Sequence, residues 1–133
     1  MSKLIIRERL IGDISVLDLE GKIMLGEGTQ ELRNTIRTHI EKSRKNILLN
    51  LENVSTIDSS GLGELVAAYT SVTKNSGRIK LLNLSKRVHE LMFITKLLTV
   101  FDVYDNEAEA INDFNANSSK IENQLPEIAK LAV

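Results

Sequence analysis

The chain has 133 residues, of which 42% are hydrophobic and 26% charged, and its formal net charge is -1 at pH 7. This length suits one domain with a single core, and the balanced charge argues against broad binding to nucleic acid or to an anionic membrane. Without cysteine, the chain can form neither disulfides nor thiolate metal sites. No apolar run approaches the roughly 18 residues of a membrane span, so we expect an unprocessed cytoplasmic protein.

The chain begins with a predicted β-hairpin. Residues 4–10 and 14–20 are short runs rich in β-branched side chains. The dipeptide Gly12-Asp13 between them suits the positive φ angles of a tight turn. We therefore expect two antiparallel strands here.

A glycine-containing loop over residues 21–28 leads to a predicted helix over 29–43. Within that helix, apolar residues recur every fourth position, which is the period of one buried stripe. They are Leu32, Ile36 and Ile40. Residues 46–51 then form a nearly continuous apolar run, which is typical of a central strand covered on both faces.

The second half alternates helices and strands. A helix begins near Ser60 and ends at residues 73–77, where residues that tolerate a left-handed conformation gather. Residues 79–82 predict a strand, and Ser85 can cap the next helix. Its expected inner face is Val88, Leu91, Met92 and Thr95.

The last predicted elements of the domain are a short strand over 100–104 and an acidic-fronted helix over 105–114. This order predicts an α/β fold, in which four helices pack on a mixed sheet of about four to five strands. We expect one domain over residues 1–114. Residues 115–133 form a linker and C-terminal tail, either helical or disordered, that can also dock a partner.

The most informative stretch is Asp58-Ser59-Ser60-Gly61-Leu62-Gly63, between a predicted strand and a predicted helix. A helical advance of 100° per residue places two sets of residues on opposite arcs. The apolar arc holds Leu62, Leu65, Val66, Tyr69 and Val72, and the small polar arc holds Ser60, Gly63, Glu64, Ala67 and Ser71. Ser60 is therefore expected to face solvent, and the two glycines would let a partner approach it closely.

Helix capping is the simpler interpretation of this turn, because Asp and Ser are common N-cap residues. Capping does not explain the two glycines, each of which costs a helix roughly 0.5 to 1 kcal/mol relative to alanine. A helix N-terminus also tolerates an anion. A phosphoryl group on Ser60 would add about -1.5 to -2 charges beside Asp58 and Glu64. This negative charge would oppose the binding of a partner while changing the structure of the chain itself very little.

The stretch from Asn50 to Gly63, with its D-S-S-G-L-G turn, resembles the signature of the STAS domain, the family of bacterial anti-sigma factor antagonists. The order of elements agrees from about residue 4 to residue 114. The resemblance implies a non-enzymatic protein that needs no cofactor. Its serine would be phosphorylated by a partner serine kinase that is also the anti-sigma factor, and dephosphorylated by a PP2C-type phosphatase. The unphosphorylated form would sequester the anti-sigma factor and release the sigma factor.

The resemblance also assigns site residues. It implies that Ser60 is phosphorylated, with Ser59 as the second choice. One position departs from the family pattern, because Met24 stands where the loop after the second strand commonly has aspartate. The expected partner-binding residues come from this turn, from the following helix and from that loop. They are Asp58, Ser59, Ser60, Gly61, Gly63, Glu64, Ala67, Met24 and Gly26.

Other functions have less support in the sequence. Gly26-Glu27-Gly28 lacks the third glycine of a dinucleotide-binding loop, because Glu31 stands there, so we expect a flexible loop that flanks the serine turn. The serine turn does not fit G-x-S-x-G, which disfavours a serine hydrolase. His39 and His89 are expected on solvated outer helix faces, which leaves no metal site.

Five basic residues are expected to form a solvated face that can also meet an acidic partner patch. They are Lys74, Arg78, Lys80, Lys86 and Arg87. An alternative role for the whole chain is that of an unphosphorylated scaffold in a stressosome-like or lipid-transport complex. The oligomeric state stays open, with a homodimer as one option.

Overall fold

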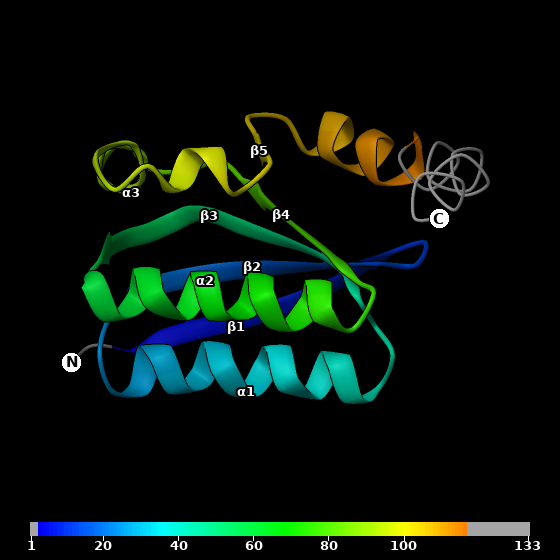
Figure 1. The fold of residues 1–133 in the computed structure, drawn as a ribbon, viewed down its shortest axis with the longest axis horizontal. Coiled ribbons are helices and arrows are strands. Elements are labelled where there is room, and N and C mark those ends of the chain that lie inside the picture. Colours follow the sequence, from blue (N-terminus) through cyan, green and yellow to red (C-terminus); the bar gives the residue numbers. More distant parts are fainter. Residues whose placement is uncertain (1–2, 117–133) are drawn as a thin grey trace, which may run out of the picture.

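A mixed five-stranded sheet with the strand order β1-β2-β3-β4-β5 forms the centre of the fold (Figure 1). The structure is a computed structural model, and it describes residues 3–116. The strands are β1 (Leu4–Ile11), β2 (Ile14–Ile23), β3 (Asn46–Ile57), β4 (Arg78–Leu82) and β5 (Val103–Tyr104). Only β1 and β2 pair antiparallel, and every other neighbouring pair is parallel.

Within residues 3–116, four helices complete the α/β fold. They are α1 (Glu27–Glu41), α2 (Ser59–Lys74), α3 (Lys86–Ile94) and a helix over 107–116, with a short 3₁₀ turn, η1 (Leu97–Thr99), after α3. The predicted fold class is confirmed. No helix among these described residues is long and apolar enough to cross a membrane. The predicted C-terminal tail lies outside the described residues from position 117 onward.

The sheet is buried on both faces, which accounts for the apolar run in β3. Leu49 and Leu51 belong to the main core, which side chains of α1, α2 and α3 complete. Leu48 belongs to a second core on the other face, beneath Ala110 and Phe114 of the 107–116 helix. Figure 1 shows α1 and α2 side by side and the 107–116 helix, in orange, across β4 from α2.

The strands around the serine turn are longer than predicted. β2 runs to Ile23 and pairs with β3 as far as Ile57, with two irregularities in register. This continued pairing leaves only residues 24–26 as the connection from β2 to α1, where the sequence predicted a loop over 21–28. The C-terminal strand is shorter than the predicted 100–104, because the Val100 and Phe101 amides donate to the Leu97 carbonyl oxygen after η1 and only Val103 and Tyr104 pair with β4.

Two residues outside the serine turn, His39 and Lys80, were predicted on the surface but are buried. His39 is buried, because its imidazole contacts the Glu8 carboxylate and the Thr35 carbonyl oxygen. His89 is exposed as predicted. Lys80 is also buried rather than part of a solvated basic face.

The Lys80 ammonium group donates hydrogen bonds to Asp102 at 2.9 Å and to Asp113 at 3.0 Å. The lysine therefore links β4 to the 107–116 helix and to the segment before β5. Because these acids come from distant positions, the basic run in the sequence did not reveal the pairing.

Candidate functional site

The serine turn lies where β3 ends at Ile57 and α2 begins at Ser59. Asp58 is the N-cap of α2, and its Oδ1 atom accepts a hydrogen bond from the Gly61 amide at 2.8 Å. Capping of α2 therefore accounts for Asp58 but not for Ser59 or Ser60. The side chain of Ser59 is exposed and that of Ser60 is half-buried. The sequence predicted Ser60 as the more accessible hydroxyl, whereas the first turn of α2 turns Ser59 further outward.

The same Asp58 carboxylate connects the serine turn to the neighbouring loop. Its Oδ2 atom accepts a hydrogen bond from the Leu25 amide at 3.1 Å. The Asp58 amide donates to the Ile23 carbonyl oxygen at 3.4 Å. The 24–26 loop therefore flanks the serine turn, as predicted. It places half-buried Met24 and exposed Gly26 beside that turn.

Leu25 is a residue that the sequence analysis missed. Its side chain is 76% exposed although it is large and apolar, and its amide is fixed by Asp58. An exposed leucine on a fixed backbone is suited to fill a partner's apolar pocket. No sequence pattern distinguishes it from a core leucine, since Ile23 and Met24 directly before it are also apolar.

The two amide hydrogen bonds, from Gly61 and then Leu25, lower the pKa of Asp58. Since the folded-state pKa is below the unfolded value, the bonds stabilise the fold above the unfolded pKa. This contribution is lost as pH falls through the folded pKa.

We predict that the Gly61 and Leu25 amide proton shifts titrate together, with a midpoint below the ordinary Asp value of 3.8. Two-dimensional NMR between neutral and acidic pH measures these shifts. In the control variant Asp58→Asn, their shared dependence on pH should disappear. Separate midpoints for the two amides would contradict a shared carboxylate.

The two glycines of the turn have different roles. A Cβ atom on Gly61 would lie 2.0 Å from the Ile23 carbonyl oxygen, so the absence of a side chain there lets α2 approach the end of β2. Gly61 is buried and does not keep the surface open, contrary to the prediction. A Cβ atom on Gly63 would meet nothing within 4 Å, and this glycine does leave open space.

Glu64 lies on the side of α2 that faces α1 and not on a solvated arc. Its side chain is only 10% exposed, and its carboxylate accepts two hydrogen bonds from the Arg33 guanidinium, from Nε at 3.2 Å and from Nη2 at 2.9 Å. The helical-wheel prediction erred because it could not include α1. Arg33 is a second residue that the sequence analysis missed.

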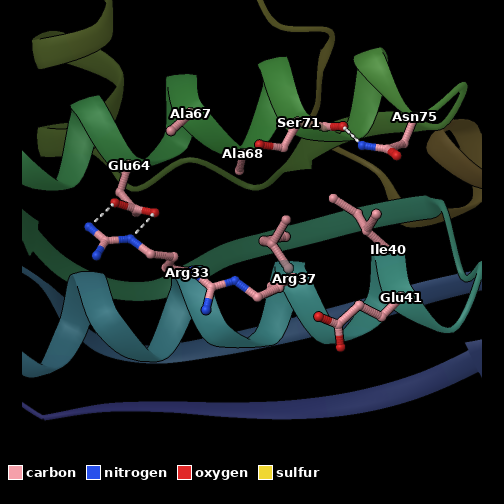
Figure 2. Close-up of a pocket in the computed structure, with 10 residues that line it drawn as sticks. Arg33, Arg37, Ile40, Glu41, Glu64, Ala67, Ala68, Ser71 and Asn75 are labelled. Atoms are coloured by element: carbon pink, nitrogen blue, oxygen red, sulfur yellow. Dashed lines mark hydrogen bonds and ion pairs between the residues drawn. The ribbon is translucent and has the colours of Figure 1, made fainter.

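A groove of about 420 Å³ lies between α1 and α2 (Figure 2). Ala67 and Ser71, both exposed, contribute to its α2 wall, and Arg37 contributes to its α1 wall. Figure 2 shows the Arg33–Glu64 pair at the end of the groove nearer the start of both helices. The candidate site thus combines the serine turn, the 24–26 loop and the first two turns of α2.

The model of the STAS domain matches residues 6–110, and the chain belongs to this family. It is 30% identical over 74 residues to the anti-sigma F factor antagonist of Paenibacillus polymyxa, across 56% of this chain and 63% of that protein. It is 43% identical over 53 residues to the anti-sigma-B factor antagonist of Bacillus subtilis, across 40% and 49% of the two chains.

The chain thus aligns with about half to two thirds of the length of these relatives. The fold is similar to that of the Bacillus cell fate determinant SpoIIAA in its phosphorylated form, with a TM-score of 0.66 and 24% identity. That comparison covers 83% of this chain and 99% of SpoIIAA.

Proposed function

We propose that the protein is a cytoplasmic, non-enzymatic anti-sigma factor antagonist whose binding to its partner is switched by phosphorylation of Ser60. The partner is an anti-sigma factor that is also a serine kinase, and binding sequesters it from its sigma factor. The named relatives are anti-sigma factor antagonists, and SpoIIAA has a phosphorylated form. These names support both the role and the modification.

The serine turn carries the proposal. Asp58 already caps α2 and fixes the neighbouring loop, so neither serine is needed for that purpose. No hydrogen bond holds the hydroxyl of Ser59 or Ser60 within residues 3–116. The kinase would transfer the terminal phosphoryl group of its nucleoside triphosphate to the serine Oγ, and the hydroxyl proton and the nucleoside diphosphate would leave. A PP2C-type phosphatase would hydrolyse the ester to restore the binding form.

The charge of the product explains the switch. Asp58 already places a carboxylate at the start of α2, whereas the charge of Glu64 is paired with Arg33, and the phosphoryl group adds about -1.5 to -2. A partner packed on this surface would have to remove water from that charge, which costs free energy, and its own acidic groups would be repelled. The rest of the fold needs no rearrangement, since the helix N-terminus tolerates an anion.

We predict that Ser60→Ala keeps partner capture while Ser60→Asp abolishes it. The full chain and both variants serve as bait in native extract, and mass spectrometry identifies the captured anti-sigma kinase and measures the intact mass of the bait. Ser59→Ala and Ser59→Asp are the matched pair for the more exposed neighbour. Equal capture by the two Ser60 variants would contradict the switch. Recovery of a large assembly with an unmodified bait would indicate the scaffold role instead.

A further inference from the structure

The Arg33–Glu64 pair joins an accessible cation to an inaccessible anion. The Arg33 side chain is 52% exposed, whereas that of Glu64 is 10% exposed. Both Glu64 oxygens are bound by the same guanidinium, at 3.2 Å and 2.9 Å. Arg33 is therefore the more accessible member of the pair, and its long side chain can rotate toward a second anion close to Glu64.

Ser60 is the serine placed to present such an anion. Residues four apart on a helix lie on the same face, with about 6 Å between their Cβ atoms, so Ser60 lies one turn before Glu64 on that face. Ser59 is turned a further 100° around the axis. In Figure 2 the Arg33 side chain extends from α1 toward Glu64 and the start of α2. Ser60 is the second residue of that helix.

We propose that Arg33 is an internal receptor for a phosphoryl group on Ser60 and that it leaves Glu64 to bind that group. This inference rests on the phosphorylation proposed above. The phosphoryl group carries more charge than the Glu64 carboxylate, and its oxygens match the two-pronged guanidinium equally well. The exchange moves positive charge toward the serine turn and leaves Glu64 without its cation.

The consequence is a second change at the partner surface. Phosphorylation adds negative charge at the serine turn and also uncovers Glu64 at the end of the α1–α2 groove. A partner that contacts the groove residues Ala67 and Ser71 would therefore meet a different arrangement of charges there. The receptor also holds the phosphoryl group against the protein and orders it.

The test installs phosphoserine at position 60 of the full chain during translation and follows its ³¹P signal as pH changes. An adjacent guanidinium favours the dianion and holds the second pKa of the phosphate below its usual value near 6, so we expect Arg33→Gln to raise this pKa by about 1. Arg37→Gln is the matched control. It removes the same charge one turn along α1, on the wall of the same groove, and a much smaller shift is expected.

Two further variants keep the test decisive if Arg33→Gln disturbs folding, which the amide spectrum reports. Arg33→Lys keeps the charge but loses the planar fork, so a smaller rise is expected. Glu64→Gln removes the competing carboxylate, so a fall is expected. Equal shifts for Arg33→Gln and Arg37→Gln, or an equal response of phosphoserine at position 59 to Arg33→Gln, would overturn the receptor.

This experiment uses neither the kinase nor the partner. A failed receptor would leave the capture results for Ser60→Ala and Ser60→Asp unchanged. Conversely, failure of the partner switch would leave the ³¹P result standing as a property of the chain. The two proposals therefore fail separately.

Discussion

Replacing Gly61 with alanine is expected to lower the free energy of unfolding by about 3 kcal/mol, the upper part of the usual range for overpacking. The added Cβ atom would lie 2.0 Å from the Ile23 carbonyl oxygen and 2.6 Å from the Ile57 side chain. A flexible side chain can move aside, but the Ile23 oxygen belongs to the backbone of a paired strand. Relief therefore requires α2 to move away from β2, which also stretches the Asp58 hydrogen bonds.

The matched control is Gly63→Ala, two residues further along the same helix. Its Cβ atom would meet nothing within 4 Å, and alanine favours the helix over glycine, so we expect stability to rise by roughly 0.5 kcal/mol. Urea unfolding followed by circular dichroism measures both variants. Similar effects for the two substitutions would show that α2 does not approach β2 as closely as described.

Replacing Phe114 with alanine is expected to lower the free energy of unfolding by about 3 to 5 kcal/mol, as for other buried Phe→Ala changes. Phe114 is fully buried beneath the sheet, with Ile14 and Val16 in the same core. The Arg78 guanidinium carbon lies 5.2 Å and the Lys80 ammonium nitrogen 5.3 Å from its ring centroid. Loss of the ring removes the apolar contacts and both cation–π contacts that hold the 107–116 helix to the sheet.

Phe93→Ala is the control for that substitution. Phe93 is 69% exposed on α3, so the same chemical change should alter stability by less than about 0.5 kcal/mol. Thermal unfolding by calorimetry compares the two variants at equal protein concentration. A small loss for Phe114→Ala would mean that the 107–116 helix is not needed to complete the second core.

The elements of the fold were predictable because each leaves a local mark on the sequence. Gly12-Asp13 predicted the hairpin, and the continuous apolar run of β3 predicted a strand buried on both faces. Ser85 was predicted to cap α3, and its Oγ atom accepts a hydrogen bond from the Val88 amide. These signals depend on neighbours within a few positions, and such neighbours can be read without knowing the fold.

The surroundings of individual side chains were less predictable, because they depend on distant segments. The helical wheel placed Glu64 in solvent, but Arg33 precedes it by 31 residues and lies on another helix. His39 likewise meets Glu8, which is 31 residues away. A periodic pattern defines which residues share a face, whereas only the packed structure shows what that face meets.

The serine turn was found from sequence, although the contacts of its residues were not. The sequence indicated Asp58, Ser59 and Ser60 as candidate caps, with Ser59 preferred, and the structure shows that Asp58 is the cap. The expected glycine-containing loop does flank the turn, although it is shorter than predicted. The sequence could not show that one carboxylate serves both connections, since Leu25 offers only a backbone amide, which every residue except proline carries. The assignment of Ser60 as the modified residue stays a prediction.

The Asp58 carboxylate ties the connection between β2 and α1 to the turn between β3 and α2, so these two segments should evolve together. Its two oxygens bind the Gly61 amide and the Leu25 amide, and Gly61 in turn contacts the end of β2. An insertion in either connection would displace the other. Chimeras between relatives should therefore retain their fold when both connections are exchanged together, and lose stability when either is exchanged alone.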